Sequence, residues 1–199
     1  MAARSYTLDS SSPGASSLAT GQIVDFFMTT TNIIGESIAS DILTLYVAAI
    51  PSKPDAPTES KTFQITSSIG GRDQLGVQVN WTAPADNGAP ILGYKLYMAQ
   101  EEDPMKLVYD GTYSRRADVL TYTVYEGVKR GLGYQFYVQA INDVGLSPLS
   151  DALQILASVV PDPPVDLNVT DSGSGSISLE WTAPEEVGGS VLTGYYIYY

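Results

Sequence analysis

Carboxylates and hydroxyls are the groups with which this sequence can do chemistry, because it contains neither cysteine nor histidine. Disulfides, thiolate metal sites and imidazole bases are therefore excluded. Acidic residues gather at Glu101-Glu102-Asp103 and at Glu185-Glu186. Neither run has the alternating oxygen ligands of a dedicated calcium loop, so we interpret both as solvated turns. We expect no metal and no cofactor.

The hydroxyl groups lack a catalytic context. No serine lies in a nucleophile elbow or a phosphate-cradling glycine loop, and without histidine a serine hydrolase would need a lysine base, for which no motif is present. We therefore expect that this segment is not an enzyme. Asn80 in "NWT" and Asn168 in "NVT" match the N-glycosylation pattern, and alternation turns both side chains outward. They predict glycosylation only if the protein is secreted.

The chain is strongly acidic, with a formal net charge of −12. Its ten Lys and Arg residues are scattered singly apart from Arg115-Arg116 and Lys129-Arg130. Because no basic stripe can neutralise phosphates, we expect no nucleic-acid partner. No apolar run approaches the roughly 20 residues that span a bilayer, and residues 1–20 lack the apolar middle region of a signal peptide. We expect protein partners and no membrane span.

An internal repeat organises the sequence. "NIIGESIASD" (32–41) returns 110 positions later as "NDVGLSPLSD" (142–151). "WTAPADNGAPILGYKLY" (81–97) returns as "WTAPEEVGGSVLTGYYIY" (181–198), displaced by 100 positions at the tryptophan and by 101 after one inserted residue. Repetition of this length predicts a tandem array. The displacement of 110 also aligns Leu18 with Val128, Gly21 with Gly131, Phe26 with Phe136 and Pro51 with Pro161.

Short strands are expected throughout, because strand-favouring Tyr, Val, Thr and Ile are interrupted by 18 Gly and 12 Pro. Between about residues 54 and 161, alternation predicts seven strands with short turns, which implies an all-β sandwich. We expect a longer turn around "SSIGGRDQLG". The predicted strands are 62–67, 75–82, 91–99, 105–110, 119–125, 132–142 and 152–158.

The period of two also predicts which side chains form the core. Burying each large one, at about 1.5–3 kcal/mol, offsets the entropy of ordering the strands. The expected core residues are Val77, Val79, Trp81, Tyr94, Leu96, Met98, Tyr134, Phe136, Val138 and Ala140.

Several spaced motifs occur in register: the starts "PDAP" and "PDPP", a tryptophan followed by "APxxxG", "GYxxY", and "GYQFYVQAINDVGLSPLS". Together they resemble tandem fibronectin type III repeats, which are immunoglobulin-like β-sandwiches with strands lettered A to G. The resemblance covers nearly the whole chain. It implies the last part of one module, strands E to G, at residues 1–51, a complete module at 52–160, and strands A to C of a third at 161–199.

The resemblance also implies residue roles. Trp81 and Trp181 would pack in the cores of their modules, and Tyr134 would form a tyrosine corner. Val24 takes the tyrosine's place in the first module, so no corner hydrogen bond is expected there. Integrin-binding members present Arg-Gly-Asp between strands F and G, where this chain has residues 143–146, "DVGL". We expect no such recognition.

The outward side of the sheet formed by strands C, F and G is the candidate protein-contact face. Clustered aromatic residues on a surface can anchor a partner at a small cost in rotamer entropy. Cross-strand packing within the sheet is the alternative interpretation. The expected neighbours on this face are Lys95, Tyr97, Tyr137, Gln139 and Ile141.

The implied function is architectural. The linkers "AAIPSKPDAP" and "SVVPDPPVD" are short and stiffened by proline, which predicts a semi-rigid rod. Such a rod would be an extracellular or cell-surface spacer, scaffold or adhesive segment that contacts neighbouring repeats or copies of itself, and a filament is one setting for it. The alternatives are a receptor ectodomain or accessory module of a secreted enzyme, and a cytoskeletal or ciliary array. The half-modules are either continued in a longer chain or completed by another molecule, which would give head-to-tail fibres.

Overall fold

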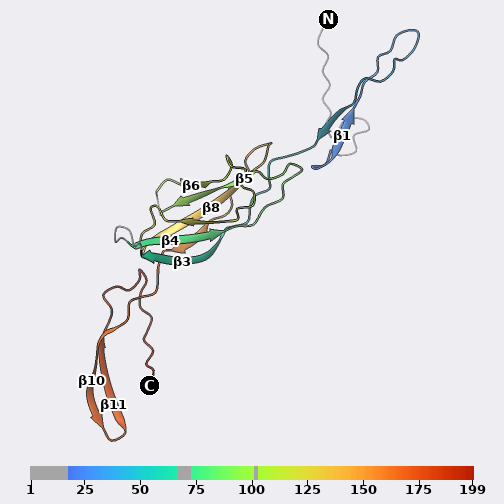
Figure 1. Cartoon of the computed structure of the whole chain (residues 1–199). Helices are drawn as coiled ribbons and strands as arrows, with labels where there is room; N and C mark the ends of the chain where they lie inside the picture. The colour runs from blue at the N-terminus through green and yellow to red at the C-terminus, as the bar shows by residue number, and fades with distance from the viewer. Residues whose placement is uncertain (1–17, 67–72, 101–102) are drawn as a thin grey trace.

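The computed structural model describes residues 18–66, 73–100 and 103–199 (Figure 1). This part of the chain forms eleven β-strands and no helix, so the predicted all-β class is confirmed. The strands lie in four antiparallel sheets. The molecule is elongated, with the two larger sheets in a central body and one two-stranded sheet toward each end (Figure 1).

The central body is a sandwich whose strands match the seven expected from alternation. The first begins four residues earlier than predicted, because the polar stretch 58–61 pairs with the next strand across a bulge between Glu59 and Lys61. Residues 67–72, within the expected longer turn, lie outside the described residues. One sheet has the order β3 (Thr58–Thr66), β4 (Asp73–Asn80), β7 (Thr121–Val124); the other has β6 (Lys106–Asp110), β5 (Gly93–Ala99), β8 (Gly133–Ile141), β9 (Leu153–Leu156).

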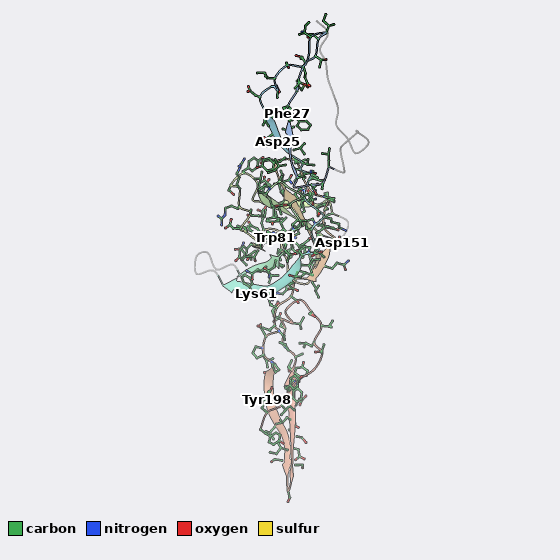
Figure 2. All side chains as sticks on the ribbon, turned by 90° about the vertical axis from the view of Figure 1, so that its right-hand side faces the viewer. Asp25, Phe27, Lys61, Trp81, Asp151 and Tyr198 are labelled. Atoms are coloured by element: carbon green, nitrogen blue, oxygen red, sulfur yellow. The ribbon has the colours of Figure 1, made fainter. Side chains whose placement is uncertain are left out.

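The two sheets enclose one core. Along β8, alternate residues from Tyr134 to Ala140 are buried while those between them are half-buried, which is the period of two expected of a strand. Trp81 lies inside the central body (Figure 2), with its ring 5.8 Å from that of Tyr94 and 6.1 Å from that of Tyr109. The buried residues include Val77, Val79, Trp81, Tyr94, Leu96, Met98, Tyr134, Phe136, Val138 and Ala140.

Tyr134 forms the tyrosine corner that the family resemblance implied. Its hydroxyl donates a hydrogen bond to the carbonyl oxygen of Gly127 at 3.0 Å and accepts one from the backbone N–H of Lys129 at 2.8 Å. The ring is buried, so these bonds tie the start of β8 to the preceding loop.

The repeated Asn-Gly-Ser-Ser pattern has the same role in both copies. The Oδ1 of Asn142 accepts hydrogen bonds from Val144 N and Gly145 N, and the Oδ1 of Asn32 accepts the equivalent two. The serines then bond to the strand before the turn. Ser147 and Ser150 accept from Ala140 N and Val138 N at 3.0 Å, and Ser37 and Ser40 accept from Thr30 N and Met28 N at 3.0 and 2.9 Å.

Each end segment forms one two-stranded sheet within the described residues. At the N-terminal end β1 (Ile23–Phe26) pairs with β2 (Leu43–Tyr46), and at the C-terminal end β10 (Val165–Gly173) pairs with β11 (Ser176–Thr182). Residues 183–199 form no strand, so the expected third strand of this segment is absent from the sheet. A segment counts as a strand only where it pairs with a neighbouring strand, and residues 183–199 pair with none in the described part of the chain.

Trp181, expected in a core, is only partly buried, and its ring lies 5.4 Å from that of Tyr195. Its equivalent Trp81 is covered by β5 and β6 residues of the opposite sheet. In the described part of the chain, β10 and β11 have no second sheet packed over them, so the ring stays accessible.

Substitution of Tyr134 by Phe should lower the free energy of unfolding of the central sandwich by about 1–3 kcal/mol, because it leaves Lys129 N–H and Gly127 C=O without their partner. Urea denaturation of the full chain measures the loss. Tyr113→Phe is the matched control, since Tyr113 is 92% exposed, and it should change stability by less than about 0.5 kcal/mol. Equal stability of the two variants would contradict the role of the corner.

Candidate functional site: one sheet face and two joints

The five residues expected on the contact face lie together on the outer side of β5 and β8. In the register of these strands Lys95 is opposite Gln139, Tyr97 is opposite Tyr137, and Ile141 is opposite Gly93. All five side chains are half-buried. We call this set the sheet face.

Hydrogen bonds hold the polar groups of the sheet face in place. The Tyr97 hydroxyl donates to Gln139 Oε1 at 3.0 Å, and Gln139 Nε2 donates to the carbonyl oxygen of Ser147 at 2.8 Å. The Tyr137 hydroxyl donates to Gln135 Oε1 at 2.7 Å. Cross-strand packing therefore fixes the rings, and a partner that contacts them pays little entropy for ordering them.

Two residues that the sequence did not indicate extend the sheet face. Leu107 of β6 is opposite Tyr97 and is 41% exposed, so it adds an apolar side chain beside the aromatic pair. Asp110 is opposite Lys95, and its Oδ2 lies 3.3 Å from Lys95 Nζ. The alternation of β6 could have indicated both, had the pairing of β6 with β5 been known.

Asp110 is the titratable group on the sheet face with a shifted pKa. Burial by itself raises the pKa of this carboxyl group, but hydrogen bonds from Thr112 and from Lys95, together with the charge of Lys95, outweigh it. The Thr112 N–H and hydroxyl both donate to Asp110 Oδ1, at 3.0 and 2.5 Å. The pKa of Asp110 therefore lies below its ordinary value of 3.8, and the carboxylate stays charged at neutral pH.

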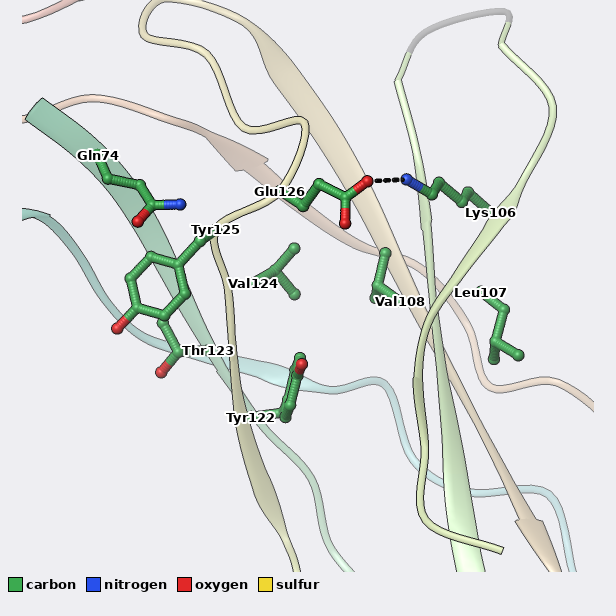
Figure 3. A pocket seen from close by; sticks show the side chains of 9 residues that line it. All are labelled: Gln74, Lys106, Leu107, Val108, Tyr122, Thr123, Val124, Tyr125 and Glu126. Atoms are coloured by element: carbon green, nitrogen blue, oxygen red, sulfur yellow. Dashed lines mark hydrogen bonds and ion pairs between the residues drawn. The ribbon is translucent and has the colours of Figure 1, made fainter. Parts of the chain in front are cut away.

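A groove opens between the edge strands β6 and β7 (Figure 3). It holds a pocket of about 250 Å³. Its apolar walls come from Leu107, Val108 and Val124, and an ion pair of 2.9 Å joins Lys106 to Glu126 at its rim. The two charged groups satisfy each other.

Metal ligands and membrane spans can be judged for the described residues alone. Among them, no three His, Cys, Asp or Glu side chains come close enough together to hold a metal ion. The acidic run at 101–103 lies largely outside these residues. Nor do they contain a helix that could cross a membrane.

The glycosylation candidates lie in strands of different exposure. Asn80 ends β4, is opposite Thr58 and Thr121, and is half-buried. Asn168 is exposed in β10, and its side-chain amide donates to the carbonyl oxygen of Asp166 at 2.8 Å.

Joint 1 is the set of contacts between the N-terminal segment with its linker, residues 18–53, and the loop 85–89 of the sandwich. The N–H of Ala49 donates to the carbonyl oxygen of Asn87 at 3.0 Å, and that of Ser52 donates to Ala85 O at 2.9 Å. Gly88 lies against Gly21 so closely that a Cβ atom on Gly88 would be 2.4 Å from Gly21 N. Loop and segment therefore meet backbone to backbone.

Joint 2 is the equivalent set between residues 128–162 and the loop 186–189. The N–H of Val159 donates to Gly188 O at 2.9 Å, and that of Asp162 donates to Glu186 O at 3.0 Å. A Cβ atom on Gly189 would lie 2.6 Å from Gly131 N.

The two joints repeat one arrangement. Ala49, Ser52 and Gly21 become Val159, Asp162 and Gly131 after a shift of 110 positions. The loop residues 85, 87 and 88 become 186, 188 and 189 after a shift of 101, which places the inserted residue at Glu185. The sequence had indicated proline-stiffened linkers, but in each joint a glycine of the loop also lies against a glycine of the adjoining segment, Gly88 against Gly21 and Gly189 against Gly131. In the sequence, these glycines were indicated only by the alignment of the repeats, which matches Gly21 with Gly131.

Asn142 attaches joint 1 to the core of the sandwich. Its side chain is 2% exposed, and its amide Nδ2 donates to Ala49 O at 2.7 Å, to Asp86 O at 3.0 Å and to Ala89 O at 3.3 Å. One buried amide thus holds linker, loop and the end of β8 together.

Comparison with known proteins gives consistent matches. The sequence profile of the fibronectin type III domain matches residues 55–155, about half of the chain. Cardiac-type myosin-binding protein C from Mus musculus is 32% identical over 180 residues, which cover 87% of this chain and 13% of that protein. Titin from Drosophila melanogaster is 29% identical over 170 residues, which cover 75% of this chain and 1% of that protein. The chain thus spans a small part of these relatives.

Among solved structures, that of titin kinase and its flanking domains is similar to this chain. The match covers 55% of this chain and 17% of the titin chain, with 27% sequence identity and a TM-score of 0.42.

Stability should depend on the ionisation of Asp110. Since its folded pKa is lowered, its contribution to the free energy of unfolding is present above about pH 4, the unfolded value, and is lost as the pH falls through the folded pKa. Asp110→Asn should therefore flatten the acid side of the stability profile in urea titrations from pH 7 to pH 2. Lys95→Met, which keeps Asp110 and removes its cation, should flatten it partly. Unchanged profiles in both variants would contradict this assignment.

Proposed function

Because the chain belongs to the fibronectin type III family, we propose that it works as a non-catalytic spacer segment of a larger tandem-repeat protein and offers a protein-binding face. Residues 52–160 would be one complete module, residues 1–51 the last part of a preceding module, and residues 161–199 the first part of a following one. The four sheets and the repeat displacements support this division.

The observation that carries the spacer function is the repetition of the joint. Two successive junctions use the same backbone hydrogen bonds and the same close approach of glycines. A flexible linker would leave the orientation of neighbouring modules undetermined. A joint in which backbone contacts backbone restricts the orientation of neighbouring modules, so the modules form a semi-rigid rod.

The binding function rests on the sheet face. Its aromatic pair, Tyr97 and Tyr137, is held by cross-strand packing and hydrogen bonds, with Leu107 and the Lys95–Asp110 pair beside it. A partner would bury the rings at the centre of the contact and leave the ion pair at the rim, the usual arrangement of a protein interface.

For the setting we propose a cytoskeletal filament array in place of the cell surface. The support is the likeness to cardiac-type myosin-binding protein C and to titin. The name of the first relative suggests myosin as the partner to test, and 87% of this chain aligns with it. Neither name supports adhesion or a secreted enzyme.

Gly88→Ala should bend the rod at joint 1 without unfolding the sandwich, because its Cβ atom would lie 2.4 Å from Gly21 N and 2.8 Å from Val47 O. Small-angle X-ray scattering of the full chain should show a shorter maximum dimension. Gly175→Ala is the matched control: its φ of +94° is close to the +84° of Gly88, so it carries similar backbone strain, of about 1–2 kcal/mol, in the turn between β10 and β11, away from both joints. A bend in both variants, or in neither, would argue against the spacer.

The full chain should co-sediment with myosin filaments, and the double variant Tyr97→Ser with Tyr137→Ser should bind about 30-fold more weakly, as expected for a lost hot spot of about 2 kcal/mol. Tyr113→Ser, which removes a loop tyrosine that is 92% exposed, is the control. If the wild-type chain stays in the supernatant, myosin is not the partner. If the double variant binds as tightly as the control, the sheet face is not the site.

A further inference from the structure

The two joints share their backbone contacts but differ in the side chains that secure them. In joint 1 the Asn87 amide Nδ2 donates to Ile50 O at 2.8 Å and to Ser52 Oγ at 3.2 Å. The equivalent residue of joint 2 is Gly188, and a Cβ atom there would lie 2.0 Å from the carbonyl oxygen of Val159. Joint 2 is therefore packed too closely to accept the amide that locks joint 1.

An ion pair takes the place of that amide in joint 2. Arg130 Nη1 lies 2.8 Å from Glu186 Oε2, and Arg130 Nη2 also donates to Gln64 of β3. The guanidinium thus links the sandwich to the C-terminal segment. The equivalent positions of joint 1 are Thr20 and Ala85, which cannot form such a pair.

The C-terminal segment is acidic, so a cation of the sandwich can attract it. Residues 161–199 contain six Asp and Glu residues and no Lys or Arg. Within residues 1–199, an ion pair that joins this segment to the sandwich therefore uses a carboxylate of the segment and a cation of residues 52–160. Among the described residues, Arg130 is the one cation that the structure pairs with the segment.

We propose that joint 2 is an electrostatic latch, in which the Arg130–Glu186 pair sets how firmly residues 161–199 dock against the sandwich, while the amide-locked joint 1 keeps its geometry. This inference rests on the proposed spacer function. It adds that the rod bends at joint 2 and that the Arg130–Glu186 pair controls the bend. The side chains of Arg130 and Glu186 are 32% and 62% exposed, so salt reaches the pair. An anionic partner that binds Arg130 competes with Glu186 in the same way.

The size of the effect follows from what exposed ion pairs contribute. Pairs of this kind shift an equilibrium by about 1.4- to 5-fold, and at about 1 M salt the screening length falls to about 3 Å. Loss of the latch should therefore change the ratio of docked to undocked segment by a few-fold and leave both folded. Hydrogen bonds from a neutral amide carry no comparable dependence on salt.

Pulsed electron paramagnetic resonance on the full chain tests the latch, because a chain without cysteine accepts spin labels only at introduced cysteines. Gln154→Cys with Ser178→Cys reports on joint 2, and Gln154→Cys with Asp41→Cys reports on joint 1; all three positions are exposed. The distance distribution across joint 2 should broaden between low salt and about 1 M salt, the concentration that shortens the screening length to about 3 Å. Across joint 1 it should not change once Lys53→Ala has removed the exposed 2.7 Å ion pair between Lys53 of the linker and Asp151 of the sandwich.

The variants Arg130→Ala and Glu186→Gln should each give the broad joint 2 distribution already at low salt. Lys106→Ala removes an ion pair of 2.9 Å inside the sandwich and serves as the control that leaves both distributions unchanged. A joint 2 distribution that responds neither to salt nor to Arg130→Ala, or that is broad from the start, would overturn the latch. A joint 1 distribution that is broad under all conditions would instead contradict the spacer function, so the two failures are distinguishable.

Discussion

The alternation of side chains along β8 is the constraint on which the rest of the structure depends. Its inward residues, Tyr134 to Ala140, fill the centre of the core, so its outward residues have fixed positions on the opposite side. A slip of one residue would exchange the two sets and move Tyr137 into the core. At its end β8 leads directly into Asn142, whose buried amide bonds to the linker and to the loop of joint 1. Core, sheet face and joint are thus connected through one strand.

The sequence predicted what local periodicity and repetition determine. Seven strands were placed within a few residues, because their buried faces impose alternation. The start of β3 was missed because pairing with β4, and not burial, makes residues 58–61 extended. The close contact of Gly21 with Gly88 was also missed, although repeat alignment had matched Gly21 with Gly131. A contact between loops so far apart in sequence leaves no pattern at either position, and glycine alone does not indicate what approaches it.

The repeated Asn-Gly-Ser-Ser motif was found as a repeat, and the structure shows what its residues do. Asn, Gly and Ser are residues typical of turns, and Asn142 Oδ1 does accept the two turn N–H groups. The serines do more than occupy the turn. Ser147 and Ser150 accept backbone N–H groups of β8 beyond the point where β9 pairs with it, so they satisfy donors that would otherwise be buried without partners. The identical bonds of Ser37 and Ser40 show that this arrangement belongs to the repeat.

The aromatic positions of the sheet face recur in the end segments, but their surroundings differ. Phe27 and Tyr198 are 61% and 89% exposed on the end segments (Figure 2). Their equivalents in the sandwich, Tyr137 and Tyr97, are half-buried on adjacent strands. The same residue types therefore gain a fixed geometry only where a complete sheet supports them. A ring held by its neighbours loses little entropy on binding, whereas a freely exposed ring must be ordered by the partner. The geometry of the sheet face is thus a property of the assembled sandwich, and the rod we propose, by limiting the angle between its modules, would also set how successive faces are presented.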